Sequence, residues 1–143
     1  MLTYFDTSVL IKSYVLEPRS EEAIELINRA GTAFPISQLI TLEMTNALQQ
    51  KIFRKDLSQQ AASRYLRAFE ADIESGYMYY PSHDMKSIFQ SAQKLSLDHS
   101  HSLGSRSLDV LHVAAALEFG CDAFVTFDQK QEKLARSAGF KIT

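Results

Sequence analysis

The sequence lacks the features of disulfide-built, membrane-spanning and strongly basic proteins. Its single cysteine, Cys121, excludes an intramolecular disulfide and is compatible with a reducing compartment. No apolar run approaches the length of a membrane span, and Asp6 interrupts the N-terminus too early for a signal peptide. The net charge is −2, so the overall charge does not indicate a nucleic-acid partner. We therefore expect a soluble cytoplasmic protein with no membrane partner, in which any nucleic acid is held by a local basic patch or through a metal ion.

What the sequence does contain is an alternation of short apolar runs and longer helical patterns. At 143 residues, with 45% hydrophobic and 22% charged residues, the chain fits one globular domain over residues 1–143. Strands separated by helices indicate right-handed crossovers, and therefore an α/β fold with a mainly parallel sheet and helices on both faces. Strands are predicted at 2–5, 33–37, 77–80, 123–127 and 140–143, and helices at 7–16, 21–30, 38–55, 58–75, 84–97, 107–119 and 129–138.

Local signals set the boundaries of these elements. Ser20 and Ser58 are predicted N-caps, and Gly31 is predicted to end a helix. The polar segment 98–106, which contains Gly104, is predicted to be a loop. The apolar face of the helix at 107–119 is expected to comprise Leu108, Leu111, Ala115 and Phe119.

Two aspartates directly follow predicted strands. Asp6 ends the first apolar run, and Asp128 ends the run at 123–127. The C-terminal ends of parallel strands open on one edge of the sheet, where α/β proteins bind ligands, so we expect both carboxylates at that edge. Taken alone, each aspartate is better explained by structure, Asp6 as a helix cap and Asp128 as a turn residue.

Two further acids lie early in apolar helices. Glu43 and Asp109 are each flanked by apolar residues on both sides. His112, three residues after Asp109, is either a hydrogen-bonding neighbour of that aspartate or a packing residue. A surface charge or a cap explains each acid alone, but two strand ends and two helix starts on α/β connections together predict one acidic pocket.

An acidic pocket of this kind requires a cation or bound protons. Two carboxylates about 4 Å apart repel by roughly 4 kcal/mol at an effective dielectric of about 20. Four acids therefore stay ionised together only if a cation joins them, and otherwise some of them take up protons. No His/Cys pattern indicates zinc, and hard oxygen ligands favour Mg²⁺ or Mn²⁺ with coordination sites left for phosphate oxygens. The pocket thus favours phosphoryl chemistry, in which a metal activates water.

Four stretches of the sequence resemble the PIN-domain nucleases, and particularly the VapC-type toxin ribonucleases. They are "YFDTSVLIK", "SQLITLEMTNAL", "RSLDVLHVAAAL" and "GCDAFVTFDQKQEKLARSAGF", and together they span the chain from its first strand to its last. Any one motif is weak, but their order, their spacing and the shared acids make the combination specific.

The resemblance implies an α/β/α sandwich and hydrolysis of RNA phosphodiesters with Mg²⁺ or Mn²⁺. It implies that Asp6, Glu43, Asp109 and Asp128 form the catalytic quartet. Asp6 and Asp109 would bind the metal directly, Asp128 would bind or orient metal-bound water, and Glu43 would complete the site or position the attacking water. It also implies a homodimer and an antitoxin protein that covers the pocket. Supporting hydroxyls would come from Thr7, Ser8 and Thr126.

Other readings of the sequence stay open. A housekeeping RNA-processing nuclease and a non-catalytic PIN-like module that binds RNA or protein are both compatible with it. Phosphoaspartyl chemistry of the haloacid-dehalogenase type, with Asp6 as nucleophile, requires a second aspartate two residues later, where this sequence has Ser8. Arg106, just before the helix of Asp109, is a candidate for touching phosphate. A further basic set, best explained as helix-surface charge, comprises Lys51, Arg54, Lys55, Arg64 and Arg67.

Overall fold

The computed structural model describes residues 1–143, and it contains all five predicted strands, each shorter than expected. Strands β1 (Thr3–Phe5), β4 (Ala123–Val125) and β5 (Lys141–Ile142) form one sheet in the order β1-β4-β5. Strands β2 (Phe34–Pro35) and β3 (Met78–Tyr79) pair separately. Every pairing is parallel, which confirms the predicted α/β fold class.

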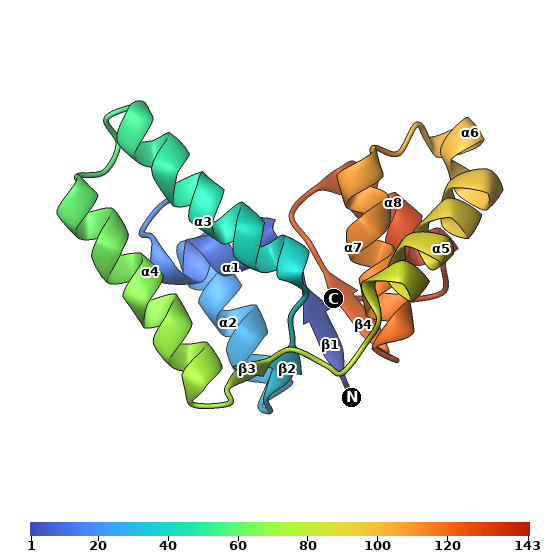
Figure 1. Ribbon diagram of the computed structural model, residues 1–143, viewed down its shortest axis with the longest axis horizontal. Coiled ribbons are helices and arrows are strands. Elements are labelled where there is room, and N and C mark those ends of the chain that lie inside the picture. The colour runs from blue at the N-terminus through green and yellow to red at the C-terminus, as the bar shows by residue number, and fades with distance from the viewer.

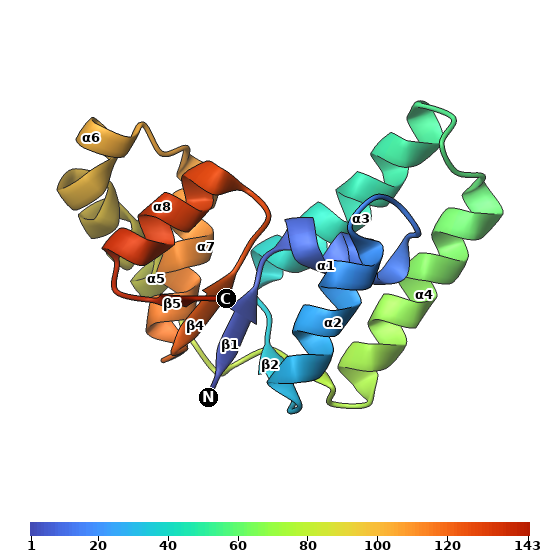
Figure 2. The same ribbon diagram turned by 180° about the vertical axis from the view of Figure 1, so that it is seen from behind.

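Helices cover both faces of the strands. Figures 1 and 2 show α3, α5 and α7 on one side and α1, α2 and α8 on the other, so the architecture is an α/β/α sandwich. No helix combines the length and the apolar character needed to span a membrane. The helices are α1 (Thr7–Tyr14), α2 (Ser20–Ala30), α3 (Gln38–Phe53), α4 (Gln59–Glu74), α5 (Met85–Leu95), α6 (His101–Leu103), α7 (Ser107–Glu118) and α8 (Gln129–Ser137), with a π-helical turn at Ser96–Ser100.

The pairing of β1 with β4 positions the site. Both strands are buried along their whole length, as expected for central strands covered by helices on both faces. The Tyr4 and Phe124 rings stack with their centroids 5.3 Å apart, and Phe5 is the register partner of Val125. The Asp6 N–H then donates to the Val125 carbonyl at 3.1 Å. The segments that follow β1 and β4 therefore leave the sheet side by side, with Asp6 beside Thr126.

The two predicted serine caps have different outcomes. The Ser58 hydroxyl accepts from the Ala61 N–H at 3.1 Å and caps α4, as predicted. The Ser20 prediction is wrong, because Arg19 occupies the N-cap of α2 in a left-handed conformation, with φ of 72°. The Ser20 hydroxyl instead donates to the Val15 carbonyl and accepts from the Glu17 N–H. Ser20 therefore stabilises the turn before the helix, and it bonds to Val15 and Glu17 instead of capping the helix.

The predicted loop at 98–106 is largely helical. Helix α5 continues through the π-helical turn into α6, and the Gly104 N–H donates to the Ser100 carbonyl at 2.8 Å. Gly104 then ends the helix with φ of 66°, a conformation that glycine adopts without strain. The polarity of this segment reflects its position on the surface, where a helix exposes polar side chains, rather than an absence of helix.

Helix α7 is buried over more of its surface than the predicted apolar face. Leu108, expected on that face, is half exposed, so the expectation is wrong there, but Ala115 is buried and Leu111 and Phe119 pack against the core as expected. The Ala114–Ala116 run is buried as a whole, and its small side chains allow α7 to pack against its neighbours α5 and α8. A single apolar stripe therefore describes only part of the buried surface of this helix.

Candidate active site

Asp6 is a buried carboxylate that leaves β1 and begins α1. It occupies the N-cap position of α1, but its side chain accepts no hydrogen bond from the backbone N–H groups that begin the helix. Its two oxygens instead accept from hydroxyls, Oδ1 from Ser8 at 2.7 Å and Oδ2 from Thr126 at 2.9 Å. Burial raises the pKa of Asp6 to about 6, against the lowering effect of the Ser8 hydroxyl, the His112 charge and the Thr126 hydroxyl. The carboxylate is thus held by two hydroxyls and does not cap the helix.

Glu43 faces this strand end from α3. Ser37 caps α3 by accepting from the Ile40 N–H at 3.3 Å, which brings the second turn of the helix over the start of α1. The Thr7 hydroxyl donates to Glu43 Oε1 at 2.7 Å, and His112 Nε2 from α7 contacts the same oxygen. Burial raises the pKa of Glu43, but the His112 hydrogen bond and charge and the Thr7 hydroxyl outweigh it, so the pKa is lowered overall. Glu43 is therefore held as a carboxylate.

Asp109 and Asp128 lie close enough to repel each other. Asp109 is half buried in the first turn of α7, and burial followed by the Asp128 charge raises its pKa. The charges of His112 and Arg106 act in the opposite direction, and Glu43 adds a smaller raising effect. The structure therefore brings the helix start and the strand end together.

Asp128 is exposed and does cap a helix. Its Oδ1 accepts from the backbone N–H groups of Lys130 at 2.8 Å and Gln131 at 3.2 Å at the start of α8. This satisfies one oxygen and leaves Oδ2 without a protein hydrogen bond. Asp128 thus caps α8 with one carboxylate oxygen and keeps the other free at the sheet edge.

Hydroxyl side chains join the two strand ends beneath the acids. The Ser8 hydroxyl, which donates to Asp6, also accepts from the Phe127 N–H at 3.0 Å. The Thr126 hydroxyl likewise accepts from the Asp128 N–H at 3.0 Å. These bonds fix the β4–α8 connection against the start of α1, so the position of Asp128 depends on the same groups that hold Asp6.

His112 is the residue whose partner the sequence did not reveal. Spacing along the helix suggested Asp109, but the imidazole contacts Glu43 from α3 and the Tyr4 hydroxyl from β1. Glu43 lies 69 positions from His112 in the chain, and Tyr4 lies 108 positions from it. The one available signal was a histidine among apolar residues in "DVLHVAAAL", which indicates a buried imidazole without naming its partners.

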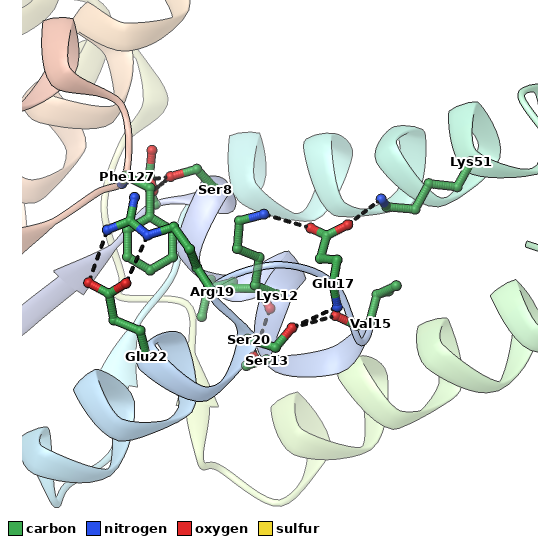
Figure 3. A network of polar contacts seen from close by, with 12 residues as sticks. Ser8, Lys12, Ser13, Val15, Glu17, Arg19, Ser20, Glu22, Lys51 and Phe127 are labelled. Carbon is green, nitrogen blue, oxygen red and sulfur yellow. Dashed lines mark hydrogen bonds and ion pairs between the residues drawn. The ribbon is translucent and has the colours of Figure 1, made fainter. Parts of the chain in front are cut away.

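Basic side chains approach the site from the α1–α2 connection. Figure 3 shows Glu17 between Lys12 and Lys51, and Arg19 over the ring of Phe127. The Glu17 carboxylate lies 3.0 Å from Lys12 Nζ and 2.6 Å from Lys51 Nζ. The Arg19 guanidinium lies 3.8 Å from the ring centroid and pairs with Glu22 through two hydrogen bonds. Lys51, expected as helix-surface charge, is instead mostly buried in an ion pair. These contacts hold the α1–α2 connection against both α3 and the β4–α8 turn.

The donor set is compatible with a hard divalent cation. No group of three or more acidic, histidine or cysteine side chains is close enough to hold a metal ion in this arrangement. Mg²⁺, however, takes only one or two carboxylates and keeps several waters, and Asp128 Oδ2 has no protein hydrogen bond. The residues present therefore fit a water-rich magnesium or manganese site better than an all-protein cage.

The fold and these residues define a class of protein: a parallel α/β domain whose ligand-binding edge carries carboxylates from two strand ends and two helices. Comparison with protein families identifies it further. The chain matches the PIN domain family over residues 3–137 and belongs to that family. PIN domains are generally nucleases that act on RNA and use divalent metals. A search of curated proteins returned no match to this chain.

Proposed function

We propose that this protein is a Mg²⁺- or Mn²⁺-dependent endoribonuclease working as a single nuclease domain over residues 1–143. One observation carries the proposal. The parallel register of β1 and β4 puts Asp6 and Asp128 at one sheet edge, where Asp128 also raises the pKa of Asp109. Like charges gathered in this way are unfavourable for folding alone, and such clusters are typical of functional sites.

Each acid has a distinct part in the proposed mechanism. Asp6 and Asp109 would hold the metal, and Asp128 would bind or orient water through its free oxygen. The metal, when bound, would activate water and stabilise the leaving oxygen of the phosphodiester. Glu43, kept ionised by His112 and Thr7, would position the attacking water. Ser8 and Thr126 keep the Asp6 carboxylate in one orientation, and exposed Arg106 would contact an RNA phosphate.

The proposal is tested with the variants Asp6→Asn and Asp109→Asn and a fluorescently labelled RNA. Each change removes one charge with little change in shape, so we expect cleavage with Mn²⁺ to fall by about a hundredfold or more, because charge stabilisation is lost. Asp98→Asn is the matched control, since Asp98 is exposed and lies outside the site. Wild-type cleavage by the purified Asp6→Asn/Asp109→Asn double variant, with circular dichroism unchanged, would refute the assignment.

We further propose that the protein is the toxin of a toxin–antitoxin pair and forms a homodimer. The motif resemblance supports this role, and so do exposed apolar side chains of the kind that protein partners cover, among them Leu16, Leu42 and Phe53. Expression should arrest growth in the wild type and not in the double variant, and co-expression of an antitoxin encoded next to this gene should restore it. Growth unaffected by an active nuclease would favour a housekeeping role.

A further inference from the structure

A buried chain of hydrogen bonds runs from β1 through α7 to Glu43, outside the set of four acids. The Tyr4 hydroxyl lies 2.9 Å from Ser37 Oγ and 2.9 Å from His112 Nδ1. The other ring nitrogen, His112 Nε2, contacts Glu43 Oε1. Tyr4 and His112 are 0% and 3% exposed, so both nitrogens of the imidazole are committed to protein partners rather than to water.

The charges along this chain assign the proton on the ring. An ionised carboxylate only accepts hydrogen bonds, and the lowered pKa of Glu43 keeps it ionised. His112 Nε2 must therefore carry a proton and donate it. The Tyr4 hydroxyl lies within hydrogen-bond distance of Nδ1 and holds this second ring nitrogen. The Tyr4 ring, stacked on Phe124 and edge-on to the imidazole, fixes the position of that hydroxyl.

The geometry at Glu43 distinguishes this arrangement from ordinary core packing. The other buried positions of α7 are all apolar, Val110 and the run Val113–Ala116. A leucine in place of His112 would fill the same space without needing a polar partner. Both protein donors to Glu43, Thr7 and His112, use the same oxygen, Oε1. Oε2 has no protein hydrogen bond, so one oxygen of the carboxylate is held by the protein and the other is free to accept a hydrogen bond.

We infer that His112, oriented by Tyr4, is a positioning residue that holds the Glu43 carboxylate with Oε2 directed to the reaction. The inference rests on the proposed nuclease function for its kinetic consequence, although the hydrogen-bond chain itself does not depend on that function. His112 does not touch the substrate in this role, and it acts only through Glu43.

Three variants and a matched control test the kinetic consequence. His112→Leu keeps the volume and removes the donor, and loss of a group that orients a catalytic residue lowers kcat by about tenfold to a hundredfold. KM stays near the wild-type value, because the RNA contacts are intact. His112→Gln places an amide donor within reach of Glu43 and restores most of kcat relative to His112→Leu. Tyr4→Phe keeps the ring, removes the hydroxyl and lowers kcat by about twofold to tenfold.

The control is Tyr14→Phe, which removes a partly buried tyrosine hydroxyl that bonds to Asp72, at the opposite end of α1 from Asp6. It should lower the melting temperature as Tyr4→Phe does but leave kcat unchanged. If Tyr4→Phe and His112→Leu both lower only the melting temperature, with kcat of the folded enzyme at the wild-type value, His112 is a packing residue and the inference fails. Tyr4→Phe keeps this test decisive if His112→Leu does not fold.

Nuclear magnetic resonance of the ¹⁵N-labelled imidazoles tests the geometry without any nuclease assay. We expect a protonated Nε2 on His112, coupled to a slowly exchanging hydrogen, and loss of that slow exchange in Tyr4→Phe. An imidazole protonated only at Nδ1 would overturn the inference even in an active enzyme. A protonated Nε2 in a protein that cleaves no RNA would leave the hydrogen-bond chain intact and refute the proposed function instead.

Discussion

Asp6 is the only acid of the chain that the fold buries, and its two oxygens accept hydrogen bonds from hydroxyls. Hydroxyl donors compensate only part of the free energy lost when a carboxylate leaves water. The result is the pKa of about 6, which makes the ionised side chain a destabilising element of the folded protein. A residue that weakens the fold in this way is expected where function requires it.

Removing this charge should stabilise the protein at alkaline pH. The pKa of Asp6 rises from its ordinary 3.8 to about 6 on folding, so between these values the folded state holds a proton that the unfolded chain has lost. The free energy of unfolding therefore falls as pH rises through this window. A shift of this size corresponds to about 3 kcal/mol at most. In urea unfolding with a chelator present, Asp6→Asn should be about 1–3 kcal/mol more stable than wild type at pH 8.

The same comparison at pH 4 supplies the internal check. Asp6 is protonated there in the folded state, so the advantage of Asp6→Asn should largely disappear. Asp98→Asn, at an exposed position, should show no difference between the two pH values. An advantage that is equal at pH 4 and pH 8 would mean that packing, and not charge, separates Asp6→Asn from the wild type.

The residues of the site were predictable to different degrees. Asp6 and Asp128 were found because a charge that ends a buried strand is a local pattern, and the sheet edge then brings the two together. The partners of His112 were not predictable, because helical spacing names only neighbours on the same helix. Tyr4 and Glu43 reach the imidazole through the packing of β1 and α3 against α7, which no local pattern encodes.

At the scale of the elements, the α1–α2 connection is fixed to the rest of the fold by charge. Glu17 lies between Lys12 of α1 and Lys51 of α3, and Figure 3 shows it bridging the two ammonium groups. All three side chains are mostly buried, so solvent screens these ion pairs less than it screens surface pairs. This bridge holds α1, which carries Thr7 and Ser8, in place against α3, which carries Glu43.

Glu17→Gln should therefore destabilise the fold. Burial raises the pKa of Glu17, but the hydrogen bonds and charges of Lys51 and Lys12 outweigh it, so the pKa is lowered overall. The stabilisation is then present above the ordinary pKa of 4.5 and is lost as pH falls through the lowered value. We expect Glu17→Gln to lower the free energy of unfolding at pH 7 by about 1–3 kcal/mol, measured with urea.

Glu25→Gln is the matched control for this bridge. Glu25 pairs with Arg29 one turn along α2, but both side chains are more than 60% exposed. Surface pairs of this kind contribute about 0.5 kcal/mol or less. Equal effects of the two substitutions would show that the buried bridge contributes nothing beyond a surface ion pair.

Element prediction failed where a helix did not follow the usual surface pattern. The segment 98–106 was predicted as a loop because its polar residues and Gly104 are typical loop signals, yet a π-helical turn carries α5 on into α6. Its exposed side chains have no need of an apolar stripe. The face of α7 was predicted only in part, because Leu111, Ala115 and Phe119 lie against the core but burial extends to Val110, Val113 and Ala114 beyond a single apolar stripe.

At the scale of the whole molecule, the site is assembled from segments that span most of the chain. Its acids come from the end of β1, from α3, from the start of α7 and from the connection between β4 and α8. Figure 1 shows how the strands stand between the α3–α4 pair and the α5–α7 group, so the acids meet only when both groups have packed on the strands. The parallel order of β1 and β4 was predictable from the alternation of strands and helices, whereas the contact of α3 with α7 through Glu43 and His112 required the structure.

A cation that joins these acids should stabilise the folded protein as a whole. The unfolded chain scatters the four carboxylates, so Mg²⁺ or Mn²⁺ would bind the folded state alone and raise its stability by mass action. At a metal concentration about 100 times the dissociation constant, the gain is about 2.7 kcal/mol. For a domain of this size, that gain corresponds to a rise in melting temperature of roughly 5–10 °C.

Scanning calorimetry over a Mn²⁺ titration measures this rise, with the Asp6→Asn/Asp109→Asn double variant as control. The rise should vanish in that variant and be reversed in the wild type by a chelator. A wild-type melting temperature that does not respond to either metal, or an equal response in the double variant, would show that the acids do not act together on a cation.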